Sequence, residues 1–369
     1  MTQAVRDIAP VCRQFQILGD FVSAAPYGSG HINETHAAVY NQGGIPIRYI
    51  FQRLNTNIFK APEGLMANVA HVTEHVRAKL AAADVTGISR KALTLIPTVD
   101  GKFYVNDPKD GFWRAYLFIE GATTHDVLEH EDQAYKAALA FGEFQSLLAD
   151  YDGPRLTETI PGFHNTPRRL DAFKKAVAED VMGRAKDVRA EIDFVLSREA
   201  LADRLLALQR SGEVPERITH NDTKLNNVML DDDTGEGICV IDLDTVMPGL
   251  SLYDFGDMVR TACNPVPEDH PDFEQVIARK DMFTALAKGY LLGTAGTLLP
   301  VERENLVVAG ELLTYECGIR FLMDHLQGDI YFRIHRPGHN LDRCRTQFEL
   351  VRSLEQQASE FMKEVRDLR

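Results

Sequence analysis

The chain has 369 residues, of which 44% are hydrophobic and 25% charged, a composition typical of a globular protein large enough for two lobes. Its formal net charge of −14 argues against a nucleic acid partner, because phosphate backbones are bound by basic surfaces. No apolar run approaches the length that spans a bilayer, and residues 1–16 lack an apolar signal core. We therefore expect a cytoplasmic protein that does not bind membranes. The five scattered cysteines predict neither a metal site nor a disulfide framework.

The first third of the chain alternates turn residues with short strand-like runs. Residues 35–40 and 48–54 predict antiparallel strands on either side of a turn at 41–46. The stretch 28–33 precedes them and is rich in glycine, which lets backbone N–H groups approach phosphate groups closely. A lone glycine pair is more often only a turn, but its position upstream of the hairpin described below favours the phosphate role. The candidate phosphate contacts are Gly28, Ser29 and Gly30.

A helix and a buried strand should complete this part of the chain. Residues 67–80 have apolar positions at helical spacing, with Glu74 either a partner for a basic strand residue or part of a solvated face. Residues 113–121 predict a buried strand that ends at a hinge, in which Trp113 anchors the core. We therefore assign residues 1–119 to an N-terminal lobe and residues 120–369 to a C-terminal lobe. The second lobe should be mainly helical, most clearly over 134–151 and 306–326.

The most informative segment covers residues 220–244. Two apolar runs, 228–230 and 238–241, flank a turn rich in Asp and Gly, and this pattern predicts a β-hairpin. A hairpin returns the chain to its start, so Asn227, just before the first strand, and Asp242, at the end of the second, should be neighbours.

Three side chains of this segment suit phosphoryl transfer. Oxygen ligands from Asn227 and Asp242 fit Mg²⁺, which prefers one or two protein ligands together with phosphates and water. Asp222 lies five residues before Asn227, so its carboxylate is placed to accept a proton from an attacking hydroxyl. His220 is expected to orient the loop. Asp244 either approaches a second Mg²⁺ or hydrogen-bonds the MPG turn that follows it.

The string Asp254-Phe255-Gly256 spells the metal motif of protein kinases, yet it lies well beyond the hairpin. We therefore assign the metal role to Asp242. Short acidic side chains accept hydrogen bonds from free backbone N–H groups, so Asp254 or Asp257 should begin a helix or brace the catalytic loop.

These residues resemble the aminoglycoside phosphotransferase and choline kinase superfamily, whose loop reads His-x-Asp-x-x-x-x-Asn and whose metal aspartate follows an apolar strand. His220, Asp222 and Asn227 match the loop, and Asp242 matches the aspartate. Collinear strings over residues 27–332, among them YGSGHINETH, THNDTKLNN and GDIYF, are similar to the bacterial N-acetylhexosamine 1-kinases of this superfamily. The resemblance implies an α+β, protein kinase-like, two-lobed fold, with an antiparallel sheet in the small N-lobe and a larger, mainly α-helical C-lobe.

The resemblance also implies where nucleotide and sugar bind. Backbone near Glu120 would hold adenine. Where protein kinases carry a strand lysine, this chain has Gln52 followed by Arg53, and only one of the two can face the nucleotide. Arg48 is a further candidate for the missing cation. Thr261 stands where we would expect a bulky apolar side chain lining the family's sugar site. The implied sugar contacts are His31, Asn33, Asp222, Arg320 and Tyr331.

The sequence thus predicts a kinase dependent on ATP and Mg²⁺ that phosphorylates the anomeric 1-hydroxyl of N-acetylglucosamine or N-acetylgalactosamine. A monomer is favoured. Two alternatives stay open. An aminoglycoside or amino-alcohol phosphotransferase would require an acidic pocket for the ammonium groups. A non-catalytic pseudokinase that only binds nucleotide would fit the missing strand lysine.

Overall fold

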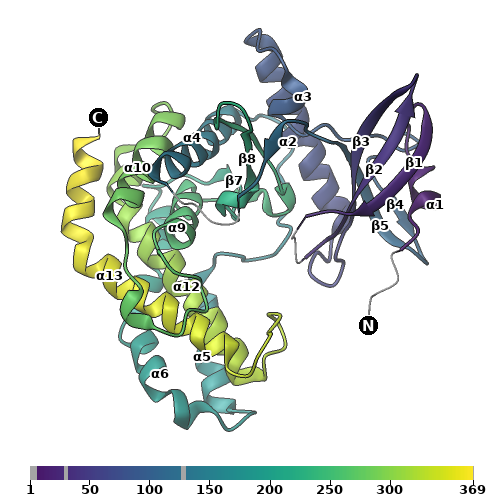
Figure 1. The fold of residues 1–369 in the computed structure, drawn as a ribbon. Coiled ribbons are helices and arrows are strands. Elements are labelled where there is room, and N and C mark those ends of the chain that lie inside the picture. Colours follow the sequence, from purple (N-terminus) through teal and green to yellow (C-terminus); the bar gives the residue numbers. More distant parts are fainter. Residues whose placement is uncertain (1–5, 29–31, 126–129, 369) are drawn as a thin grey trace.

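The computed structural model describes residues 6–28, 32–125 and 130–368, and Figure 1 shows a sheet-based lobe beside a larger helical lobe. The smaller lobe is built on a five-stranded antiparallel sheet in the order β1-β2-β3-β5-β4. Its strands are β1 (Asp20–Pro26), β2 (Glu34–Gln42), β3 (Ile45–Arg53), β4 (Val105–Asp107) and β5 (Gly111–Leu117).

The central hairpin of this sheet confirms the predicted strand pair. β2 and β3 pair antiparallel, with Tyr40 opposite Ile47. Their turn is tighter than the predicted one, because Gly43 and Gly44 have φ of 63° and 93° and close it in two residues. Positive φ at both central residues gives the turn a twist that matches the flanking strands, so the ladder extends to the glycines.

Three helices accompany the sheet: α1 (Ala9–Cys12), α2 (Pro62–Ala82) and α3 (Ile88–Lys91). The long helix α2 contains the predicted helix 67–80 and begins with a proline at its first position, where no intrahelical N–H donor is needed. Glu74 is exposed and forms no ion pair with the described residues, so it belongs to a solvated face. Trp113 of β5 is fully buried and its Nε1 donates to the carbonyl of Asp110, as expected for a core anchor.

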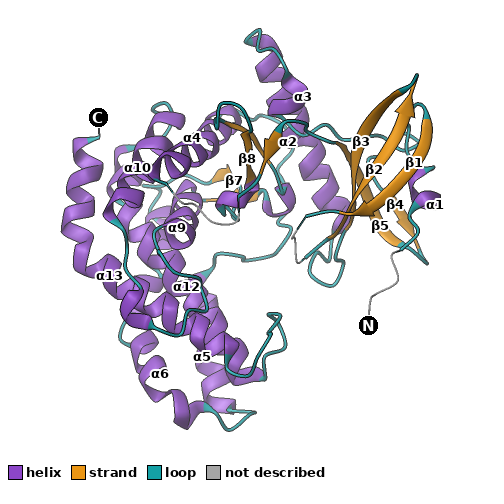
Figure 2. Cartoon of the chain, viewed as in Figure 1, coloured by secondary structure: helices purple, strands orange, loops and turns teal. Residues whose placement is uncertain are grey.

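The larger lobe is a helical assembly with short strands, purple and orange in Figure 2. Its helices are α4 (Glu131–Leu148), α5 (Thr166–Glu179), α6 (Arg189–Leu196), α7 (Glu199–Ala202), α8 (Arg204–Arg210), α9 (Ser251–Ala262), α10 (Lys280–Gly293), α11 (Pro300–Glu304), α12 (Leu306–Gln327) and α13 (His339–Asp367). Its strands are β6 (Ala122–Thr123), β7 (Arg217–Thr219), β8 (Val228–Asp231), β9 (Gly237–Val240) and β10 (Met247–Gly249). Among the described residues, no helix is both long and apolar enough to cross a bilayer.

The predicted helices 134–151 and 306–326 are confirmed as α4 and α12, and the predicted hairpin is β8–β9. The fold is therefore the α+β, protein kinase-like arrangement expected from the sequence. The boundary between residues 119 and 120 remains a proposal. All five cysteines are free and buried.

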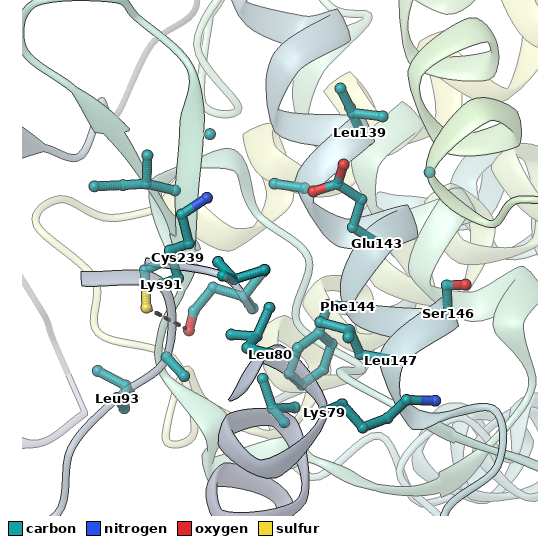
Figure 3. A pocket seen from close by; sticks show the side chains of 18 of the residues that line it. Lys79, Leu80, Lys91, Leu93, Leu139, Glu143, Phe144, Ser146, Leu147 and Cys239 are labelled. Atoms are coloured by element: carbon teal, nitrogen blue, oxygen red, sulfur yellow. Dashed lines mark hydrogen bonds between the residues drawn. The ribbon is translucent and has the colours of Figure 1, made fainter. Parts of the chain in front are cut away.

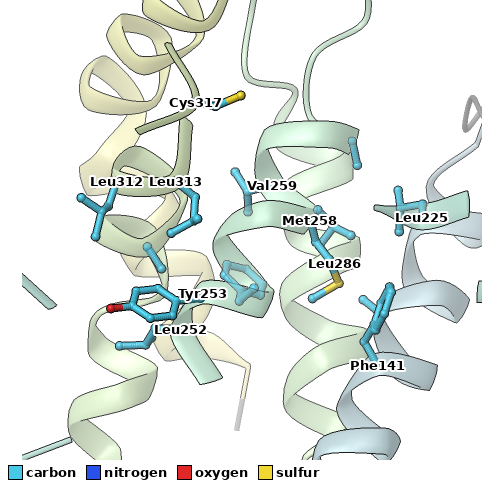
Figure 4. Packing of buried hydrophobic residues seen from close by; sticks show 14 of the residues in the cluster. Phe141, Leu225, Leu252, Tyr253, Met258, Val259, Leu286, Leu312, Leu313 and Cys317 are labelled. Carbon is cyan, nitrogen blue, oxygen red and sulfur yellow. The ribbon is translucent and has the colours of Figure 1, made fainter. Parts of the chain in front are cut away.

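Helices α9 and α12 form the centre of the larger lobe, with α10 and α4 alongside (Figure 4). The side chains of Phe255 and Met258 are fully buried at this centre. Gly256 lets the two helices approach closely, because a Cβ at this position would lie 2.3 Å from the carbonyl oxygen of Ala309. Within the Asp-Phe-Gly sequence of residues 254–256, Phe255 and Gly256 thus serve helix packing.

Gly256→Ala should lower the free energy of unfolding by about 1–3 kcal/mol, the usual cost of overpacking, because the backbone of α12 must move. Gly310→Ala is the matched control. Its added Cβ meets a Val259 methyl group at 2.8 Å, which can yield more easily than a carbonyl, so we expect a smaller loss. Denaturant unfolding of both variants measures this difference. Equal or higher stability of Gly256→Ala than the parent would contradict it.

Candidate active site

The β8–β9 hairpin brings the two predicted metal ligands together. Val228 pairs with Val240, and the N–H of Ile241 donates to the carbonyl of Asn227 at 2.8 Å. Asn227 ends a short 3₁₀ turn before β8, and Asp242 follows β9 in a left-handed conformation with φ 56°. The end of one strand thus lies beside the start of the other, as predicted.

Asp222 is tied to the same hairpin. The Nδ2 atom of Asn227 donates to the Asp222 carbonyl at 2.8 Å and to Oδ2 of its carboxylate at 3.3 Å. Lys224 Nζ lies 3.6 Å from the other carboxylate oxygen. Desolvation opposes ionisation, but the positive charges of Lys224 and Arg260 and the hydrogen bond from Asn227 outweigh it and lower the pKa of Asp222 below its ordinary value. The carboxylate is therefore ionised at neutral pH and able to accept a proton or a hydrogen bond.

The catalytic loop is held in place by Asp254. This fully buried carboxylate accepts hydrogen bonds from the backbone N–H groups of His220 at 3.0 Å and Asn221 at 2.7 Å, and from Gln145 Nε2 at 2.6 Å. Asn221 has φ 64°, so the loop bends sharply just before Asp222. Asp254 therefore has the bracing geometry expected from the sequence, with its oxygens already engaged.

His220 supports the loop from the other side. Its Nε2 contacts the carbonyl of Ile241 at 2.9 Å, and its Nδ1 accepts from the N–H of Asp222 at 3.3 Å. The ring is buried against the edges of Phe141 and Phe144. Both ring nitrogens are engaged with backbone, so the geometry suits an orienting group rather than a proton carrier.

The region around Asp242 fits a divalent cation. No described residue donates a hydrogen bond to its carboxylate. Desolvation and the neighbouring carboxylates of Asp244 and Asp222 raise the pKa of Asp242 to about 7. Such an uncompensated carboxylate beside the amide of Asn227 provides the hard oxygen ligands that Mg²⁺ uses. Within the described ranges, no cluster of three or more His, Cys, Asp or Glu side chains could hold a metal, so the site would rely on phosphate and water oxygens as well.

Asp244 corrects the sequence prediction, which offered a second Mg²⁺ or the MPG turn as its partner. The carboxylate is buried and accepts hydrogen bonds from Arg114 Nη1 and, at 2.6 Å, from Asn33 Nδ2. Both donors come from the smaller lobe. Asn33 also accepts from the N–H of Asn55 at 3.1 Å, so both ends of the amide predicted to contact sugar are engaged within the protein.

The nucleotide candidates on β3 separate to opposite faces. Gln52 faces Arg114, whose Nε and Nη2 donate to Gln52 Oε1 at 3.0 and 2.8 Å. Arg53 points the other way, where Nε donates to the carbonyl of Asp110 at 2.7 Å and Nη1 lies 3.5 Å from Glu34. Gln52 therefore lies on the side of the carboxylates, and the structure does not place Arg53 with them.

Two other nucleotide candidates, Arg48 and Glu120, contact each other near the predicted hinge. Arg48 pairs with the carboxylate of Glu120 and lies 3.7 Å over the ring of Phe118. Arg90 Nε donates to the Glu120 carbonyl at 3.1 Å. Gly28 is exposed with φ 79°, and a Cβ there would meet none of the described residues within 4 Å. Ser29, Gly30 and His31 lie outside the described residues.

The predicted sugar contacts Arg320 and Tyr331 lie together. The Arg320 guanidinium carbon lies 5.5 Å from the Phe163 ring centroid, 5.9 Å from that of Tyr331 and 5.4 Å from that of Phe332. It donates no hydrogen bond to any residue that the structure describes. Tyr331 is 60% exposed. The result is a guanidinium among aromatic rings with free donors.

A chain of contacts joins this cluster to the catalytic loop. His164 follows Phe163, and its Nε2 lies 3.2 Å from the carbonyl of Asn221, the residue before Asp222. Its Nδ1 lies 2.9 Å from the buried carboxylate of Glu316. The aromatic cluster is thus positioned against the loop that carries the candidate base. Thr261 on α9 bonds its hydroxyl to the Asp257 carbonyl of its own helix at 2.9 Å.

A cavity of about 760 Å³ lies behind the hairpin, between α2, α4, β9 and the end of α10 (Figure 3). Its walls are mainly apolar, with Leu80, Leu93 and Phe144 among the lining side chains. Val240 and Leu243 line it from either side of Asp242 in the chain, but Asp242 itself does not. This cavity therefore lies behind the metal-ligand segment and is separate from the candidate catalytic groups.

Sequence reasoning missed Arg114 and Asp324. Arg114 is the one charged residue in the buried run FWRAYLFI, and a charge inside a buried strand requires a partner. Asp324, within apolar helix α12, accepts hydrogen bonds from the N–H groups of Ile330, Tyr331 and Phe332 at 2.8–3.0 Å and so shapes the loop of the aromatic cluster. Both signals were visible in the sequence, but their partners were not.

One family model matches most of the chain, and several solved structures share its fold. The profile of the phosphotransferase enzyme family (APH) matches residues 23–281. An aminoglycoside phosphotransferase structure from Alicyclobacillus acidocaldarius is 13% identical over 99% of this chain and 97% of its own, with a TM-score of 0.60. A spectinomycin phosphotransferase in complex with ADP and spectinomycin is 11% identical, with 96% and 100% of the two chains covered and a TM-score of 0.60. A choline kinase from Cryptosporidium parvum is 15% identical over 98% of both chains, with a TM-score of 0.55. These structures share the fold.

Metal binding should follow the ionisation of Asp242. With a pKa of about 7, this carboxyl is mostly neutral at pH 6 and mostly ionised at pH 8. We expect Mn²⁺, measured by electron paramagnetic resonance on the nucleotide-free protein, to bind about tenfold more weakly at pH 6. Asp242→Asn should bind weakly at both pH values. Equal affinity of the parent at the two pH values would contradict the assignment.

Proposed function

The chain belongs to the phosphotransferase enzyme family, and from that membership we propose that it transfers the γ-phosphoryl group of ATP to the anomeric 1-hydroxyl of an N-acetylhexosamine. The observation that carries the chemistry is the ionised carboxylate of Asp222, held beside Asn227 and Asp242 at the ends of one hairpin. The collinear resemblance to N-acetylhexosamine 1-kinases supports the choice of substrate. The guanidinium of Arg320 beside Tyr331, on the side where the acceptor would bind, supports it as well.

Each catalytic residue has a distinct task in this proposal. Asp222 accepts a hydrogen bond from the sugar hydroxyl, orients its oxygen toward the phosphorus atom and takes up its proton as the new bond forms. Asn227 and Asp242 would hold Mg²⁺, which neutralises phosphate charge when bound. Lys224 keeps Asp222 ionised between turnovers. The backbone hydrogen bonds to Asp254 keep the loop from moving away from the phosphates.

The charges around the acceptor side favour a hydroxylated sugar over a polycation. Glu316 contacts His164 and Arg169, and both Asp257 and Glu268 pair with Arg260. Among the described residues of this region, Arg320 donates no hydrogen bond within the protein, so its guanidinium is free to contact a ligand. A guanidinium can donate to hydroxyl and acetamido oxygens, whereas the ammonium groups of an aminoglycoside or of choline would be repelled. This polarity favours the sugar reading over the amino-alcohol and aminoglycoside alternatives.

The proposal is tested by Mg²⁺-ATP turnover on N-acetylglucosamine, N-acetylgalactosamine, glucose, galactose, kanamycin and choline, with the position of the new phosphate read by ³¹P NMR. We expect a sugar 1-phosphate from an N-acetylhexosamine. Activity confined to kanamycin or choline would reject the sugar assignment while retaining phosphoryl transfer. No turnover of any acceptor together with intact nucleotide binding would favour the pseudokinase.

Asp222→Asn should lower kcat by about 10²–10⁴-fold, the usual contribution of a general base, and leave ADP binding nearly unchanged. The substitution removes proton acceptance but keeps the side-chain shape. Asp150→Asn, which alters an exposed partner of Lys79, is the control and should retain full turnover. Steady-state kinetics with calorimetric ADP binding provide both readouts. Near-parental kcat in Asp222→Asn would refute its role as the base.

A further inference from the structure

The cation that a kinase-like N-lobe is expected to carry on β3 is absent there, and the neighbouring strand β5 carries Arg114 instead. On β3 the expected position carries Gln52, and the basic candidates Arg48 and Arg53 pair with Glu120 and with Glu34. In the β3–β5 ladder, Gln52 lies directly opposite Arg114. The buried face of the sheet therefore still presents a cation, one strand further along.

All three nitrogen atoms of this guanidinium are engaged inside the protein. Nε and Nη2 donate to Gln52 Oε1, and Nη1 donates to Asp244 Oδ1. The side chains of Arg114 and Asp244 are 1% and 3% exposed. Tyr116 covers the guanidinium, with its ring centroid 5.2 Å from Cζ. Three of its five N–H groups are used in these bonds, and a side chain that is only 1% exposed is closed to a phosphate.

Asp244 connects this cation to the metal-ligand turn. It lies in the 3₁₀ turn Leu243–Thr245, whose preceding residue, Asp242, has a left-handed backbone. A non-glycine residue keeps such a conformation only where its surroundings hold it there. Asn33 adds a second bond from the smaller lobe to the same carboxylate at 2.6 Å. The turn is therefore fastened to the sheet by two side chains.

We propose that Arg114 is a positioning residue that acts through Asp244: it fastens the Asp242 turn to the N-lobe sheet and so replaces the strand lysine without touching the phosphates. The inference deepens the proposed function, since it rests on Asp242 being a metal ligand. It predicts that Arg114 and Asp244 act as a unit. Metal binding should depend on this pair, whereas nucleotide binding without metal should not.

A double-mutant cycle of Arg114→Gln and Asp244→Asn tests this prediction. Mn²⁺ binding to the ADP-loaded protein should weaken by about tenfold or more in each single variant, within the range typical of coupled sites, and by no more in the double variant. ADP binding in the presence of EDTA should stay at the parental value in all three. Because no acceptor is needed, failure to phosphorylate sugars would reject the proposed function without affecting this readout.

Matched variants keep the test decisive. Arg345→Gln breaks the partly buried ion pair with Glu191 and should leave Mn²⁺ binding unchanged. If loss of the buried arginine prevents folding, Asn33→Ala removes the other bond to Asp244 and should weaken Mn²⁺ binding in the same direction. Weaker metal-free ADP binding in Arg114→Gln but not in Asp244→Asn would show a direct phosphate contact and overturn the proposal. Parental Mn²⁺ binding in the folded variants would also overturn it.

Discussion

The carboxylate of Asp254 accepts the backbone N–H groups of His220 and Asn221, and the geometry of the site depends on these bonds. A buried, unpaired N–H group costs stability, so the two hydrogen bonds hold the backbone of His220 and Asn221 in a fixed position against α9. The chain turns through the left-handed Asn221 and delivers Asp222 to the hairpin. Gly256, two residues along the same helix, lets α12 pack against it. One turn of helix thus positions both the catalytic loop and the core behind it.

Most elements of the fold could be predicted from local sequence patterns. The β8–β9 hairpin, the β2–β3 pair and the helices α4 and α12 have periodicities that neighbouring residues impose, so each could be predicted from its own segment. Contacts between distant segments could not. Arg114 and Asp244 are 130 positions apart, and no local pattern states that one neutralises the other. Asp244 was therefore assigned to metal or turn when its partners lie in the other lobe.

Basic and acidic side chains occupy different parts of the candidate site. The chain is acidic overall, yet Lys224, Arg260 and Arg320 lie around the loop and the aromatic cluster. The proposed metal-ligand segment is more acidic, because the carboxylates of Asp244 and Asp222 lie near Asp242 and are offset in part by Arg114 and Lys224. In the proposed function, the carboxylates would attract the metal ion that accompanies the phosphates, and the basic side chains would keep the proposed base ionised.

The assignment of the metal ligands is tested most directly by a crystal structure with Mn²⁺ and a non-hydrolysable ATP analogue, in which anomalous scattering locates the metal. The account predicts Mn²⁺ bound by the Asn227 amide oxygen and the Asp242 carboxylate. Asp254 should still hold the catalytic loop, and Asp244 should remain paired with Arg114. Metal on Asp254, or on Asp244 with Arg114 released to the phosphates, would contradict the division of roles among these carboxylates.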